Sequence, residues 1–254
     1  MPNPAVLITG TSRGIGLHLA QRFLKEGYWV IGVSRNPAPI QDPNYQEFTA
    51  DLGDLDQVKA LTKKLDGLPI CGLINNAGIH GPSGAFENIS LDDWLQTFNI
   101  NLFGAAALAQ SCIPSLRQHN GFIIFLSGGG SAFPRANFTA YGVSKCGVVR
   151  LADTLAAELS PDVMVYCIAP GPNRTVLLDE SRESGETVRE EDIVGFDFPE
   201  KLCLFLAENR DPRYSGKFIH VRDDYQSWGD DQLASDAYTL RRIDPRTLSK
   251  VNLV

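Results

Sequence analysis

The stretch that decides the fold is Ala5–Gly16, which reads AVLITGTSRGIG. Its first five residues are apolar or β-branched, which is typical of a buried strand. The glycines at positions 10, 14 and 16 then allow a tight turn and a close approach of the backbone to a bound group. A helical pattern begins directly after this loop, and the N-terminus of a helix attracts phosphate. Although the spacing is G-x-x-x-G-x-G rather than G-x-G-x-x-G, the strand, loop and helix together predict a dinucleotide site.

Further along the chain, short apolar runs alternate with longer helical patterns. We expect strands at 5–9, 29–33, 47–50, 70–75, 122–126, 163–168 and 217–221, and helices near 14–26, 54–66, 91–118, 139–160 and 199–208. This alternation predicts β-α-β units, in which helices cover both faces of a parallel sheet. The sequence therefore predicts an α/β fold. It would be a single Rossmann-type domain over 1–254 with a doubly wound parallel sheet of about seven strands.

The composition excludes several classes of protein. The 254 residues carry 23 Lys and Arg against 30 Asp and Glu, a net charge of −7, whereas a nucleic-acid-binding protein needs a basic face. The longest apolar stretch, 102–109, is far shorter than the roughly 18 residues of a membrane span, and the N-terminus lacks a secretory pattern. Five widely spaced cysteines without a C-x-x-C pair favour reduced thiols and no metal site. We therefore expect a cytoplasmic protein that binds neither nucleic acid nor membrane.

The end of the second predicted strand indicates which dinucleotide is preferred. An NAD site usually has an acidic residue here for the ribose 2′-hydroxyl, but this chain has Ser34 and Arg35. Arg13, next to Ser12, adds a second guanidinium group within the glycine-rich loop. Two guanidinium groups suit a 2′-phosphate, so the sequence favours NADP(H). The alternative is that one of these arginines is a solvated surface residue.

With its later motifs, the chain resembles the short-chain dehydrogenase/reductase family over residues 5 to about 221. The matching motifs are Thr9–Gly16, Asp51-Leu52, Asn75-Asn76-Ala77-Gly78, Asn101, Tyr141-x-x-x-Lys145, and Pro170-Gly171 with Thr175. The resemblance implies an oxidoreductase that forms a homodimer or homotetramer. Together with the glycine-rich loop and the end of the second predicted strand, the resemblance predicts a set of cofactor contacts. They are Gly10, Ser12, Arg13, Gly14, Ile15, Gly16, Ser34, Arg35, Asp51, Leu52, Asn76, Ala77, Gly78, Tyr141, Lys145, Pro170, Gly171 and Thr175.

Tyr141 and Lys145 are four residues apart, so on a helix they share one face. A tyrosine pKa near ~10 makes a poor base at neutral pH, and we expect the nearby ammonium group to lower that pKa. Tyr141 would then donate a proton to a carbonyl oxygen, or remove one in the oxidative direction. Lys145 would also hold the nicotinamide ribose. The resemblance implies that Asn101 helps a water relay protons to the lysine. The alternative is an amphipathic helix with one aromatic residue and a snorkelling lysine.

One position departs from the family pattern. The family usually has a serine thirteen residues before the tyrosine, and here that residue is Gly128. Ser127, our candidate catalytic serine, is one residue early, and Ser131 is three residues late in a glycine-rich loop. Backbone N–H groups of the glycines are a third candidate for binding the substrate oxygen.

Two segments remain for the substrate. Residues 172–195 are expected to form a substrate loop, and its part 179–192 carries seven acids and two arginines. The 33-residue C-terminal extension, 222–254, contains Arg241 and Arg242, which either grip a substrate phosphate or pair with nearby aspartates. We expect no role for His80, and helix packing for Cys146.

The sequence predicts an enzyme that interconverts a small-molecule ketone and a secondary alcohol, with a keto-sugar or nucleotide-sugar as one candidate. The alternatives are a 3-oxoacyl-thioester reductase and a catalytically weak NADP(H)-binding regulator.

Overall fold

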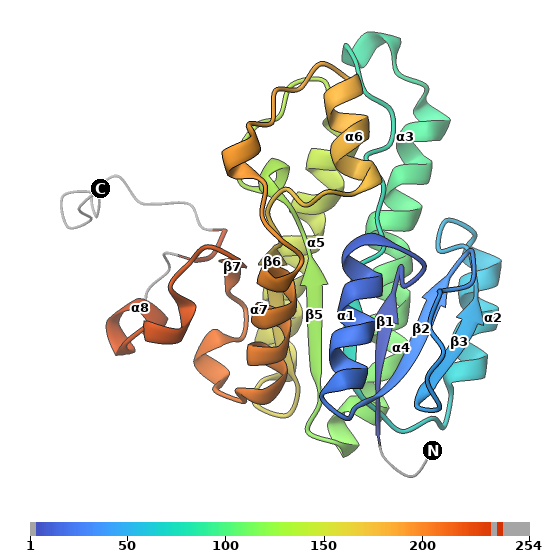
Figure 1. Cartoon of the computed structure of the whole chain (residues 1–254), viewed down its shortest axis with the longest axis vertical. Coiled ribbons are helices and arrows are strands. Elements are labelled where there is room, and N and C mark those ends of the chain that lie inside the picture. The colour runs from blue at the N-terminus through green and yellow to red at the C-terminus, as the bar shows by residue number, and fades with distance from the viewer. Residues whose placement is uncertain (1–3, 235–237, 241–254) are drawn as a thin grey trace.

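The computed structural model describes residues 4–234 and 238–240, and its centre is a seven-stranded parallel sheet (Figure 1). The strands are β1 (Ala5–Thr9), β2 (Trp29–Ser34), β3 (Tyr45–Thr49), β4 (Ile70–Asn75), β5 (Phe122–Leu126), β6 (Met164–Ala169) and β7 (Phe218–His220). Their order in the sheet is β3-β2-β1-β4-β5-β6-β7. The predicted α/β fold is therefore confirmed. The chain starts in the middle of the sheet, builds outward to β3, and returns to build the other half from β4.

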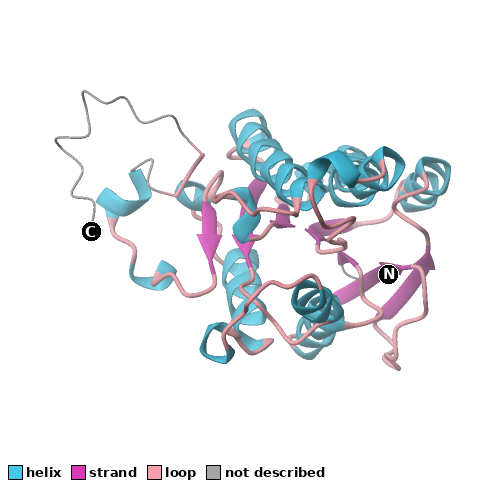
Figure 2. Ribbon diagram, turned by 90° about the horizontal axis from the view of Figure 1, so that it is seen from above, coloured by secondary structure: helices cyan, strands magenta, loops and turns pink. Residues whose placement is uncertain are grey.

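Helices cover both faces of the sheet, as the view from above shows (Figure 2). They are α1 (Gly14–Lys25), α2 (Leu55–Leu65), α3 (Leu91–Phe98), α4 (Gly104–Gln118), α5 (Thr139–Leu159), α6 (Val176–Glu183), α7 (Asp197–Glu208) and α8 (Asp230–Ala234). One buried apolar cluster joins α2, α4 and α5 to one face of the sheet, and a second joins α1 and α7 to the other. Because both faces are covered, strands such as β1 and β5 are buried along their whole length and read as continuous apolar runs.

The helix predicted over 91–118 is interrupted. Residues 99–103 form a π-helical turn between α3 and α4. The side chain of Asn101 points out of this turn and bonds to the backbone of Ile79, 22 residues earlier. Since π-turns often lie at functional sites, the interruption marks this position.

The segment expected as a substrate loop, 172–195, contains α6, which lies above the carboxyl ends of the strands (Figure 1). Leu178 is buried on the inner side of this helix. A helix this short is stabilised mainly by such tertiary packing and little by its own helix propensity.

The described part of the C-terminal extension packs on the edge of the sheet. The rings of Trp228 and Tyr238 stack with centroids 3.9 Å apart, and the Phe218 N–H donates to the Tyr238 carbonyl at 2.6 Å. Arg241 and Arg242 lie outside the described residues.

Cys146 is exposed, so the packing role expected for it is wrong. Within 4–234 and 238–240, no helix combines the length and the apolar character that a membrane crossing needs.

Candidate active site

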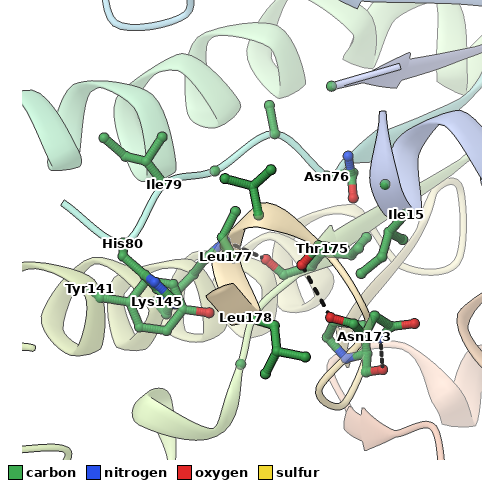
Figure 3. Close-up of a pocket in the computed structure, with 18 of the residues that line it drawn as sticks. Ile15, Asn76, Ile79, His80, Tyr141, Lys145, Asn173, Thr175, Leu177 and Leu178 are labelled. Carbon is green, nitrogen blue, oxygen red and sulfur yellow. Dashed lines mark hydrogen bonds between the residues drawn. The ribbon is translucent and has the colours of Figure 1, made fainter. Parts of the chain in front are cut away.

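A cavity of about 1060 Å³ opens beyond the carboxyl ends of the strands, where α/β sheets of this kind bind their ligands. His80, Tyr141 and Lys145 lie at one end of it, and Ile15 and Asn76 lie toward the other (Figure 3). Of the residues predicted from the sequence, all but Gly16 and Asn101 line this cavity. Gly16 packs against Gly10, and Asn101 is hydrogen-bonded to Ile79, and both of these partners line the cavity.

The glycine-rich loop forms a tight cradle between β1 and α1. Gly10 has a φ of 76°, and a Cβ atom there would lie 2.7 Å from the Asn76 amide nitrogen. A Cβ atom on Gly16 would collide with the Gly10 carbonyl oxygen. The first turn of α1 contains no acidic residue, and no side chain of the described residues caps it. The helix N-terminus therefore presents its N–H groups and its positive dipole end to the cavity, as a pyrophosphate requires.

The end of β4 is tied to the end of β1. The Asn76 amide donates to the Thr9 carbonyl at 2.8 Å, and the Asn76 and Ala77 N–H groups both donate to Thr9 Oγ1 at 3.0 Å. These bonds fix the segment that follows β4, of which Asn76, Ala77 and Gly78 line the cavity.

At the end of β2, Arg35 is exposed and lines the cavity together with the exposed Arg13. The Ser34 hydroxyl is turned into the structure, where it donates to the Asn36 carbonyl at 2.6 Å. It thereby shapes the loop that carries Arg35. Asp51 and Leu52 line the same end, and Asp51 Oδ1 accepts the Gly53 N–H at 2.9 Å.

The other walls come from β6 and the segment after it. Pro170, Gly171 and Thr175 line the cavity, as predicted. Asn173, which the sequence did not indicate, donates to the carbonyls of Pro170 and Gly171 at 2.8 and 2.9 Å. Its Oδ1 atom is buried and has no hydrogen-bond partner among the described residues, so it is left able to accept from a bound amide group.

Tyr141 and Lys145 lie on the same face of α5, and both are buried. Lys145 Nζ donates to the Leu126 carbonyl at 2.8 Å, which fixes the ammonium group at the end of β5. Asn101 is held by Ile79 through two bonds of 2.9 Å and donates to Ser144 Oγ at 3.0 Å. A Cβ atom on Gly78 would lie 3.1 Å from Asn101 Oδ1 and 3.2 Å from Lys145 Nζ. The amide oxygen and the ammonium group therefore face the same small space.

Burial sets the proton affinities of this pair. It raises the pKa of Tyr141 above its usual value, so the lowered pKa expected from the sequence is wrong for this structure. The charge that acts against this rise comes from Arg135. Burial also lowers the pKa of Lys145 to about 8.

Neither serine near Gly128 turns its hydroxyl toward Tyr141. Ser127 Oγ donates to the Lys145 carbonyl at 3.1 Å, and Ser131 Oγ donates to the Gly128 carbonyl at 2.6 Å. The structure therefore does not support the catalytic role predicted for Ser127. Its hydroxyl instead ties the end of β5 to α5. That the backbone N–H groups of the glycines bind the substrate oxygen stays a prediction.

Comparison with known proteins decides the family. Residues 4–186 match the sequence model of the family described as short chain dehydrogenase, which is more than half of the chain. The chain belongs to this family. It is therefore an oxidoreductase, and the resemblance drawn from its motifs is confirmed.

Individual relatives agree with this assignment. Protein FixR of Bradyrhizobium diazoefficiens is 33% identical over 196 residues, which cover 70% of each chain. Benzil reductase ((S)-benzoin forming) IRC24 of Saccharomyces cerevisiae is 32% identical over 198 residues, which cover 70% of this chain and 75% of the relative. Among solved structures, the ligand-free aldohexose dehydrogenase of Thermoplasma acidophilum is 26% identical, with a TM-score of 0.77. That match covers 86% of this chain and 92% of the other.

Sequence reasoning gave no individual role to several further cavity residues of this short-chain dehydrogenase, among them His80, Arg135 and Glu186. His80, for which no role was expected, lies in the loop after β4, is 5% exposed and lies edge-on to Tyr141 with ring centroids 4.8 Å apart. Arg135 and Glu186 form an ion pair within the cavity wall. The position of His80, two residues after the Asn-Asn-Ala-Gly motif ends at Gly78, was the available signal. For Arg135 no local pattern pointed to the cavity.

Proposed function

We propose that this short-chain dehydrogenase is an NADP(H)-dependent enzyme that interconverts a small-molecule ketone and a secondary alcohol. The observation that supports this most is the arrangement of one continuous cavity. It has a glycine cradle and an open helix N-terminus in the middle, exposed Arg13 and Arg35 at one end, and Tyr141 with Lys145 at the other. The first end suits a 2′-phosphate, and the second suits a reacting carbonyl group.

The residues of the chain would act as follows. When bound, the nicotinamide supplies or accepts the hydride. Tyr141 gives its proton to the carbonyl oxygen in reduction, and the raised pKa of Tyr141 keeps that proton available at neutral pH. Lys145, held on the Leu126 carbonyl, is placed to bind the nicotinamide ribose. Asn101 faces the same space as Lys145 and is placed to hold a water molecule that relays protons to the lysine.

The substrate class has several candidates. A keto-sugar or nucleotide-sugar and a 3-oxoacyl thioester both follow from the sequence analysis. The names of two relatives add benzil and an aldohexose. The second candidate function is a catalytically weak NADP(H)-binding regulator. It is favoured by one observation: no serine hydroxyl of the described residues faces Tyr141 near Gly128.

A single experiment separates these functions. NADPH oxidation is followed with benzil, a keto-sugar and a 3-oxoacyl thioester, using the wild type, Tyr141→Phe and Cys146→Ser. We expect turnover of at least one carbonyl, a loss of roughly a hundredfold or more in Tyr141→Phe, and wild-type rates in Cys146→Ser, whose exposed thiol adjoins Lys145. Tight NADPH binding without turnover of any carbonyl would instead support the regulator.

The other sequence-based expectations stay predictions. Light scattering would test the homodimer or homotetramer, and cell fractionation would test the cytoplasmic location.

A further inference from the structure

Arg135 lies directly beside the proposed proton donor. Its guanidinium carbon is 4.0 Å from the centroid of the Phe138 ring and 5.3 Å from the centroid of the Tyr141 ring. Cations over aromatic faces at such distances are attracted to the ring, so Arg135 helps to fix both rings. Its charge also lies within reach of the Tyr141 hydroxyl, where it favours the phenolate form.

The opposite edge of Arg135 is bound to the segment 172–195. Its Nε atom donates to Glu186 Oε1 at 2.8 Å, and its Nη2 atom donates to Glu186 Oε2 and, at 2.9 Å, to Ser181 Oγ. A two-point pair of this kind fixes the plane of the guanidinium group as well as its position. The two side chains are 18% and 30% exposed, so the pair is only partly screened by solvent. One arginine therefore connects the segment over the cavity to Tyr141.

Among the described residues, the other charged or titratable groups around Tyr141 come from α5, from the loop after β4 and from α6. Lys145, on the same helix, has its Nζ atom 6.0 Å from the tyrosine ring centroid. His80, from the loop after β4, is neutral at neutral pH because burial lowers its pKa to about 4, and Glu180 Oε2 lies 3.6 Å from its Nδ1 atom. The two side chains of the ion pair act on the Tyr141 pKa in opposite directions. The positive charge of Arg135 lowers it, and the negative charge of Glu186 raises it.

We propose that Arg135 is a positioning residue for Tyr141, and that Glu186 modulates its effect. The arginine holds the tyrosine ring and carries a positive charge beside it, while the carboxylate from the segment 172–195 offsets that charge as long as the two are paired. Docking of this segment is thereby coupled to how firmly Tyr141 holds its proton. This inference rests on the proposed function, in which Tyr141 exchanges the proton with the substrate.

The test measures the proton affinity of Tyr141 directly and needs no substrate. The full chain is labelled with ¹³C at the tyrosine Cζ atoms, and the Tyr141 signal is assigned by its absence in Tyr141→Phe. The midpoint of its titration is then compared among the wild type, Arg135→Gln, Arg135→Lys and Glu186→Gln. The control is Arg213→Gln, which removes the same charge from an ion-paired arginine that does not line the cavity.

The proposal expects shifts of opposite sign. Arg135→Gln raises the Tyr141 midpoint by about one pH unit, Glu186→Gln lowers it, and Arg135→Lys restores most of the wild-type value because the charge is kept. Arg213→Gln leaves the midpoint unchanged. Glu186→Gln changes a partly exposed side chain, so it keeps the test decisive if Arg135→Gln is poorly folded in thermal melts.

Three results would overturn the inference: shifts in the same direction, no shift relative to Arg213→Gln, or a Glu186→Gln protein whose Tyr141 never titrates within the folded pH range. Opposite shifts in a protein that turns over no carbonyl would refute the proposed function alone.

Discussion

The hydroxyl of Tyr141 lies against the backbone of Gly128, so closely that a Cβ atom on Gly128 would stand 2.5 Å from Tyr141 Oη. Real Cβ atoms do not approach an oxygen this closely, so any side chain at 128 would require the tyrosine to move. The glycine at this position is therefore matched to the observed place of the tyrosine hydroxyl.

This contact predicts that Gly128→Ala lowers turnover by roughly tenfold to a hundredfold, because a displacement of the reacting group by a fraction of an ångström to one ångström has such effects. Gly129→Ala is the matched control, since a Cβ atom there would meet nothing within 4 Å. Steady-state rates of both variants on the best carbonyl from the panel provide the measurement. Equal rates in the two variants would show that the position of Tyr141 does not depend on Gly128.

The two serines next to this glycine should matter more for stability than for turnover. Ser127→Ala and Ser131→Ala each remove a hydroxyl that donates to a backbone carbonyl, which costs about 1 kcal/mol of unfolding free energy. We expect rates within about threefold of the wild type, because the hydroxyls do not face Tyr141. Denaturant unfolding and steady-state rates are measured together. A hundredfold loss of rate in Ser127→Ala would restore the serine as a catalytic residue.

Arg35 should discriminate between the two dinucleotides. Arg35→Gln removes a guanidinium group from the cavity, and a hydrogen bond to a charged group is worth about 1.5–3 kcal/mol. We therefore expect NADPH binding to weaken by roughly 10- to 100-fold and NADH binding to change little, as measured by fluorescence titration. Arg117→Gln is the control because Arg117 is exposed on α4 and does not line the cavity. Equal weakening for both dinucleotides would contradict a 2′-phosphate site.

His80 should make stability depend on pH in mildly acidic solution. Burial lowers its pKa in the folded protein to about 4 from an ordinary value of 6.5. Between these values the unfolded chain binds more protons than the folded one, so unfolding free energy rises as pH rises from 4 to 6.5. The rise amounts to roughly 3 kcal/mol at 1.36 kcal/mol per pKa unit. His80→Phe removes this group but keeps an aromatic ring against Tyr141.

The measurement for His80 is the difference in unfolding free energy between the wild type and His80→Phe, determined by denaturant titration at several pH values. Other groups that titrate in this range cancel in the difference. A difference that stays constant from pH 4 to 6.5 would mean that His80 keeps an ordinary pKa in the folded protein.

Local sequence patterns predicted most of the sheet, because buried parallel strands are apolar runs bounded by turn residues. The bounds of β1, β4 and β5 agree with the predicted ranges. The break at 99–103 could not be predicted in this way. The apolar pattern continues through it, and the bonds that accompany it join Asn101 to Ile79, 22 residues away in sequence.

In the candidate site, too, the features set by local spacing were predicted and those set by long-range contacts were not. Tyr141 and Lys145 were predicted to share a face because a spacing of four residues on a helix is a local property. The orientation of Ser127 depends on a carbonyl group 18 residues later, and the ion pair of Arg135 depends on a carboxylate 51 residues later. No local pattern carries such information.

The sequence by itself determined the α/β fold, the glycine cradle, the family and the helix face that carries Tyr141 and Lys145, since all of these follow from short-range geometry and residue type. Only the tertiary structure decided the environment of the tyrosine. It buried the phenol, placed Gly128 against its hydroxyl, and turned both serines away. It also brought His80 and Arg135 to its ring and paired Arg135 with Glu186. Burial and electrostatic interaction depend on distances between atoms in space, and the fold sets those distances between residues that lie far apart along the chain.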